Sequence, residues 1–212
     1  MALNMTTGKE YWNNEAKQWK NSHGLGERAE NARSFIRDEV GKFLPTDNND
    51  LILNLGAGND FQSLNLWNPE RIISLDYAHK MLDEDCIFKP VEADVRDALP
   101  ILDSSVGMVC SFFLMRYLSH EQRVALLTES DRLLKPGGYV LFIDVPDNSH
   151  FLQVEKFDPS TLVDAVSSLG MELKRKVSTL RKVGRYVETG FGGWHEGGSY
   201  VIGSLVAMKK FR

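Results

Sequence analysis

The sequence predicts an α/β fold built on a doubly wound, mainly parallel sheet, and two observations support this class. Short apolar runs recur from residue 51 onward, and most of them are followed by a polar or helical stretch. A glycine-rich turn, "NLGAGND" at 54–60, directly follows the first apolar run. Strands that alternate with helices favour parallel strands joined by crossovers, and in such sheets the first turn carries the glycines.

The expected elements follow in chain order. Residues 1–45 are polar and studded with aromatic residues, and we expect two helical pieces at 8–21 and 26–44, the second closed by Pro45. The strands are expected at 51–55, 71–75, 88–92, 106–111, 138–144, 171–180 and 199–208. Helices are expected at 61–67, 78–83, 120–134 and 159–169.

Composition and charge exclude several kinds of protein and binding partner. The chain has 212 residues, 42% of them hydrophobic, which suits one domain with a real core. A net charge of -4, with both signs mixed along the chain, argues against a nucleic-acid partner. Cys86 and Cys110 stand far apart and outside any metal-binding spacing, so we expect free thiols and no metal. No segment reaches the roughly 18 apolar residues of a membrane span, so a cytoplasmic protein without a membrane partner is expected.

The glycine turn indicates a nucleoside site. Gly56 and Gly58, with Ala57 between them, let the backbone turn sharply and approach a ligand. A dinucleotide loop would need glycine where Phe61 stands, and Asp60 would repel a phosphate at a helix start. We therefore expect a nucleoside without phosphates at this turn, with a ligand-free glycine turn as the alternative.

Two later carboxylates extend this interpretation. Asp76 ends the second strand, 18 residues after Gly58, where a carboxylate can accept both hydroxyls of a ribose. Tyr77 follows and can lie against an adenine ring. Asp94 and Val95 come just after the third strand, where a carboxylate beside a free backbone N–H can recognise the adenine edge. Each residue alone is an ordinary loop residue, but the ordered set favours an adenosyl ligand.

Five stretches resemble the motifs of class I S-adenosylmethionine (SAM)-dependent methyltransferases. They are "LILNLGAG" at 51–58, "ISLDYAHKML" at 73–82, "EADVRD" at 92–97, "VGMVCSFFLMRYLS" at 106–119 and "LLKPGGYVLF" at 133–142. The resemblance implies a Rossmann-like seven-stranded sheet with the last strand antiparallel, and SAM across the carboxyl ends of its strands. It also implies that Asn54 holds either loop N–H groups or the methionine amino group, and that Ser111 and Phe112 border the methionine part.

The chain departs from the family pattern at three positions, one of which is Asp60, where the family commonly has glycine. Asn54 stands where the family usually has an acidic residue, and Gly107 stands where it usually has an aspartate. The amide of Asn54 can still accept hydrogen bonds but lacks the charge.

Methyl transfer depends mainly on orientation and on excluding water, so one fixed catalytic residue is not required. The candidates are Tyr11 in an aromatic N-terminal helix, Arg116 after the fourth strand, and His195 in a glycine-rich stretch. Arg116 can grip a carboxylate, and His195 can act as a general base. The alternatives are a packing helix, an exposed arginine and a solvated loop histidine.

We expect one domain over 1–212, with a helical lid at 1–45 and an α/β core at 46–212. The predicted function is methylation of a small molecule by a monomer or homodimer. The alternative is an enzyme of the same fold, a cyclase or lyase, that consumes SAM and releases methylthioadenosine.

Overall fold

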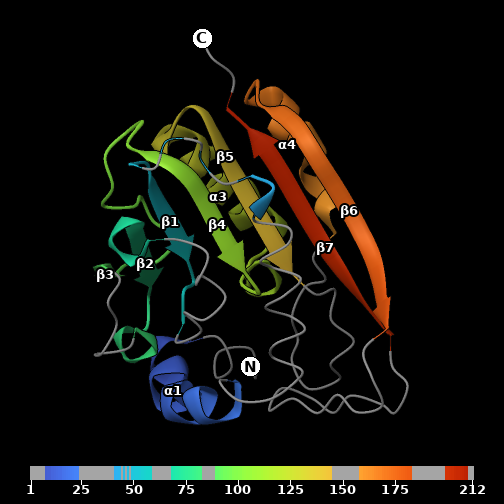
Figure 1. Ribbon diagram of the computed structural model, residues 1–212. Helices are drawn as coiled ribbons and strands as arrows, with labels where there is room; N and C mark the ends of the chain where they lie inside the picture. Colours follow the sequence, from blue (N-terminus) through green and yellow to red (C-terminus); the bar gives the residue numbers. More distant parts are fainter. Residues whose placement is uncertain are drawn as a thin grey trace.

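A computed structural model describes residues 8–23, 41–43, 45, 47, 49–58, 68–82, 89–144, 158–182 and 199–209. Its centre is one seven-stranded sheet with the order β3-β2-β1-β4-β5-β7-β6 (Figure 1). The strands are β1 (Leu51–Leu55), β2 (Ile72–Asp76), β3 (Lys89–Glu92), β4 (Val106–Phe112), β5 (Leu134–Asp144), β6 (Glu172–Lys182) and β7 (Ser199–Met208).

The strand directions confirm the predicted α/β class. The neighbouring pairs from β3 through β5 are parallel, and β7 runs antiparallel to both β5 and β6. The central strands are buried along almost their whole length. Burial on both faces explains why they are nearly continuous apolar runs in the sequence.

β5 begins four residues earlier than predicted. The N–H of Gly137 donates to the carbonyl of Lys209 at 2.8 Å, and the N–H of Lys209 donates to Gly138 at 2.9 Å. Gly137 adopts φ 81°, a conformation that glycine accepts without strain. These bonds continue the ladder with β7 through the turn that the sequence placed before the strand.

The helices match the predictions in type more closely than in length. α3 (His120–Leu133) begins at a capping box in which Ser119 and Gln122 exchange hydrogen bonds. The helix expected at 159–169 is a short 3₁₀ turn, η5 (Pro159–Leu162), followed by α4 (Val163–Ser168). The helix expected at 78–83 is only η3 (His79–Met81). The predicted helix at 61–67, and most of the one at 26–44, lie outside the described residues.

α1 (Lys9–His23) lies next to the carboxyl ends of the central strands (Figure 1). Trp12 and Ala16 are buried in a small apolar cluster with Ala78 and Met81, separate from the main core of the sheet. The side-chain oxygen of Asn13 also accepts a hydrogen bond from the Lys80 N–H at 3.1 Å. The N-terminal helix is therefore attached to the loop that follows β2.

Within the described part of the chain, no helix has both the length and the apolar character needed to cross a membrane.

Candidate functional site

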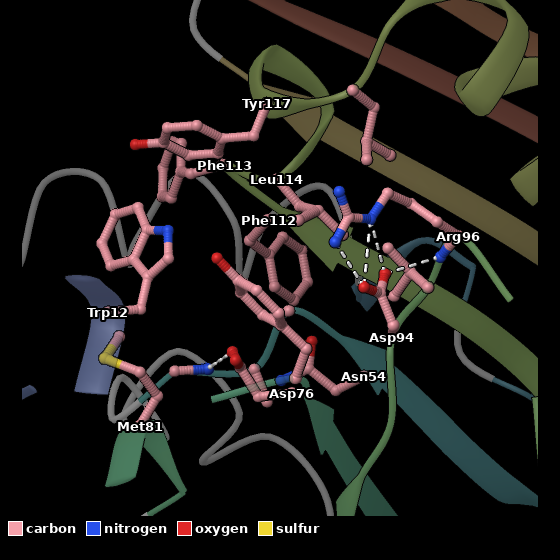
Figure 2. A pocket seen from close by; sticks show the side chains of 16 residues that line it. Trp12, Asn54, Asp76, Met81, Asp94, Arg96, Phe112, Phe113, Leu114 and Tyr117 are labelled. Atoms are coloured by element: carbon pink, nitrogen blue, oxygen red, sulfur yellow. Dashed lines mark hydrogen bonds and ion pairs between the residues drawn. The ribbon is translucent and has the colours of Figure 1, made fainter. Parts of the chain in front are cut away.

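A pocket lies at the carboxyl ends of β1, β2 and β4 (Figure 2). The chain runs outward from β1 through β2 to β3 and then returns to β4 on the other side of β1. Ligands of doubly wound sheets bind at this reversal of strand order. The pocket gathers nine of the ten residues predicted at the cofactor, which are Asn54, Gly56, Ala57, Gly58, Asp76, Tyr77, Asp94, Val95 and Phe112.

The glycine loop brings bare backbone to the pocket wall. Gly56 has φ 62° and Gly58 has φ 52°, both in the left-handed region that favours glycine. A Cβ atom at Gly56 would also lie 3.1 Å from the side chain of Leu114. A larger residue would therefore be strained and would displace Leu114, which also lines the pocket.

Asp76 joins the glycine loop to the end of β2. Its Oδ2 accepts the Gly58 N–H at 3.1 Å, and its Oδ1 accepts the Ala78 N–H at 3.0 Å. A carboxylate has about four acceptor positions, so these bonds leave acceptor capacity for the hydroxyls of a ribose. Burial raises the pKa of the Asp76 carboxyl above its ordinary value, and hydrogen bonds from the backbone N–H groups of Ala78, Gly58 and Tyr77 partly offset the rise.

Asp94 is held by Arg96, a residue that the sequence analysis did not select. The Arg96 Nε lies 2.9 and 3.0 Å from the two Asp94 oxygens, its Nη2 lies 2.5 Å from Oδ2, and its backbone N–H donates to Oδ1 at 2.9 Å. These hydrogen bonds lower the pKa of Asp94, so the carboxylate is ionised at neutral pH. The only sequence signal for this pair is the spacing of two in "DVRD".

Asn54 and Phe112, the residues expected at the methionine end of the ligand, both line the pocket. Asn54 is buried, and its side-chain oxygen lies 3.8 Å from the Cys110 thiol, whose pKa is raised by burial. Ser111, the tenth predicted residue, is fully buried and is not among the described residues of the lining. Side chains alternate between the faces of a strand, so Ser111 lies on the face opposite Phe112.

Aromatic side chains form the wall opposite Asp94 (Figure 2). Trp12 from α1 meets Tyr117 edge to face, with ring centroids 5.4 Å apart, and both residues line the pocket. Tyr11 packs on the outer side of Trp12 at 5.2 Å. Burial, followed by the negative charge of Glu15, raises the pKa of Tyr11. This phenol is therefore protonated at neutral pH and is a hydrogen-bond donor, not a base.

The guanidinium of Arg116 binds a carboxylate of the protein itself. Its Nε lies 2.8 Å from Oδ1 of Asp144 and its Nη2 lies 2.5 Å from the same atom, while its backbone N–H donates to Oδ2 at 2.9 Å. Asp144 is fully buried at the end of β5, and Arg116 is not among the described lining residues. The structure therefore places Arg116 as a support for η4 (Met115–Tyr117), the turn that carries Tyr117.

Some of the predicted residues lie outside the described part of the chain. These include His195, the general-base candidate, together with Asp60 and Phe61 of the glycine loop. Among the described residues, no group of His, Cys, Asp and Glu side chains is arranged to hold a metal ion.

The comparisons with known proteins point to one chemistry. Residues 53–142 match the family model described as a methyltransferase domain. Phosphoethanolamine N-methyltransferase 1 of Triticum aestivum is 31% identical over 143 residues, which are 62% of this chain but only 29% of the relative. The chain thus spans less than a third of the length of this curated relative.

Solved methyltransferase structures share the fold. Magnesium protoporphyrin IX methyltransferase of Synechocystis PCC 6803, with bound S-adenosylhomocysteine (SAH), is 13% identical, with a TM-score of 0.66 over 95% of this chain and 97% of that one. A structure of the Trm112 methyltransferase activator of Haloferax volcanii in complex with its partner protein includes a chain that is 16% identical, with a TM-score of 0.65 over 99% of both chains. At these identities the likeness establishes the sheet topology.

Proposed function

We propose that this chain, which carries a class I SAM-dependent methyltransferase domain, transfers the methyl group of SAM to a small-molecule acceptor. The observation that carries the proposal is the pocket at the reversal of strand order. There the glycine loop, Asp76 and Asp94 meet the aromatic wall from α1 and η4. The residues proposed to recognise the nucleoside therefore lie beside the aromatic residues proposed to exclude water.

In this proposal each part of SAM has its own residues. The Asp76 carboxylate accepts the ribose hydroxyls with the acceptor capacity that its hydrogen bonds to backbone N–H groups leave free. Asp94 accepts from the adenine amino group, with Tyr77 and Val95 beside the base. Asn54 and Phe112 lie at the methionine end. The remaining predicted residues that line the pocket are the two glycines and Ala57. Their role is to let the backbone approach the ligand closely.

The bound cofactor supplies a methyl group on a sulfonium, and transfer breaks the sulfur–methyl bond as the acceptor–methyl bond forms, leaving SAH. The chain contributes orientation and a dry site. Trp12 and Tyr117 bring aromatic rings to the pocket, and the face of such a ring attracts a positive charge. A base is needed only for an acceptor atom that must lose a proton, and His195 is our candidate for that role.

A small acceptor is supported by the position of α1. Trp12 is buried at the pocket and α1 is attached through Asn13, so the helix covers this side of the opening. We infer that α1 is a lid that leaves room for a compact acceptor. Phosphoethanolamine and magnesium protoporphyrin IX, the molecules in the names of two related enzymes, are both small.

The test is mass spectrometry after incubation with SAM, first alone and then with a metabolite extract. We expect SAH only when the extract is present, together with a metabolite that has gained one methyl group. Asp76→Ala is the matched control and should suppress both signals. Methylthioadenosine released without an acceptor, above the spontaneous decay of SAM, would replace this proposal with cyclisation of the cofactor.

A further inference from the structure

We propose that Arg96 is a specificity-determining residue of the cofactor site, because it orients the Asp94 carboxylate so that one acceptor position faces the 6-amino group of the purine. The inference rests on the proposed function and deepens it. It assigns recognition of the base to a pair of side chains instead of to one carboxylate.

The contacts restrain the carboxylate of Asp94 from two sides. Three N–H groups of Arg96, on the backbone N, Nε and Nη2, donate to its two oxygens. Both residues line the pocket, and Figure 2 shows the guanidinium directly above the carboxylate. The Arg96 Cζ lies 5.9 Å from the centroid of the Tyr77 ring, which also restrains the guanidinium. Rotation of the Asp94 carboxylate would break several of these bonds at once.

A count of acceptor positions shows that the base can enter without displacing Arg96. An ionised carboxylate offers about four acceptor positions. Three distinct donors of Arg96 occupy Asp94, and the Nε–H is shared between the two oxygens. These are four contacts, two on each oxygen, but the shared Nε–H is one hydrogen and fully occupies neither oxygen. About one acceptor position is therefore left, which suits one hydrogen of an amino group. The structure therefore favours a purine that donates at C6.

The same geometry disfavours a purine with a carbonyl at C6. A carbonyl oxygen would face an anionic oxygen, and neither atom carries a proton to share. Such a base has a donor at N1 instead, and only a carboxylate that is free to rotate can reach it. Because Arg96 prevents that rotation and keeps Asp94 ionised, we expect Arg96 to set the discrimination between the two bases.

The experiment measures dissociation constants by calorimetry for SAH and for S-inosylhomocysteine, its analogue with a 6-oxo base. The full chain is compared with Arg96→Ala and Arg96→Lys. Lys89→Ala, which removes an exposed positive charge on neighbouring β3, is the control for net charge. The parent should prefer SAH by about 10-fold to 100-fold, the range of one well-placed polar contact to a base.

Arg96→Ala should reduce this preference to about threefold or less, chiefly by improving the relative binding of the inosyl analogue. Arg96→Lys should give an intermediate preference, since a lysine supplies charge without the planar fork, and Lys89→Ala should match the parent. If the parent binds SAH and Arg96→Ala keeps the same preference for SAH, the role of Arg96 is overturned and the proposed function is not. Failure of the parent to bind SAH would overturn the proposed function and this inference with it.

Discussion

Replacing Arg116 by alanine is expected to destabilise the fold by about 3 kcal/mol, at the low end of the roughly 3–5 kcal/mol for breaking a buried ion pair. Asp144 has a fully buried side chain, and the side chain of Arg116 is 16% exposed. The substitution removes the contacts of Nε and Nη2 with Oδ1 but leaves the backbone N–H of residue 116 on Oδ2. This remaining bond is the reason for choosing the lower end.

Urea unfolding followed by circular dichroism measures the loss. A companion thermal scan should show a melting temperature lowered by roughly 6–12 °C, at about 2–4 °C per kcal/mol for a chain of this size. The matched control is Arg96→Ala, which breaks an arginine–aspartate pair with exposed fractions of 48% and 24%. Its cost should be at most about 1 kcal/mol, as for other solvent-screened pairs.

A double variant separates lost pairing from lost packing. Arg116→Leu alone leaves the Asp144 carboxylate buried without its guanidinium, whereas Arg116→Leu with Asp144→Leu removes both charges. The double variant should therefore be more stable than the single one. The reasoning is refuted if Arg116→Ala costs no more than Arg96→Ala, or if the double variant is the less stable.

Three further perturbations test other parts of the structure. Asp76→Ala should weaken SAH binding by about 2–4 kcal/mol, since two hydrogen bonds to a charged group are lost; unchanged affinity by calorimetry would remove Asp76 from the ribose site. Because ribose hydroxyls favour the ionised carboxylate, binding should lower the raised pKa of Asp76. The parent should therefore bind more weakly and release more protons as the pH falls toward that pKa, whereas Asp76→Ala should lack this release. Deleting residues 1–22 should leave a cooperatively folded sheet that binds SAH but has lost turnover, because the lid excludes water; a truncated protein with full activity would make α1 merely structural. Gly107→Ala should lower the free energy of unfolding by about 1–3 kcal/mol through overpacking, because the added Cβ would lie 2.6 Å from the Asp50 Cβ. In the control Gly41→Ala the added Cβ meets nothing within 4 Å, so the same urea titration should show little change.

The sequence by itself determined the sheet and the residues at the ends of its first strands. Apolar runs at 51–55 and 106–111 predicted buried parallel strands, and the polar residues directly after such runs predicted the pocket. Parallel topology is the physical reason this works. When consecutive strands point the same way, the residue after each strand arrives at the same edge of the sheet, so chain order alone brings the glycine loop, Asp76 and Asp94 together.

Tertiary structure decided the partners of the charged side chains. Arg116 has the sequence context of a substrate-binding arginine, but its partner is Asp144, 28 residues further along the chain. At Gly107, where the family usually has an aspartate, the Asp50 side chain on the segment before β1 occupies the space that a Cβ atom would need. A guanidinium reaches any carboxylate within several ångströms. Which carboxylate lies within reach depends on how distant elements pack, and local pattern carries no information about that distance.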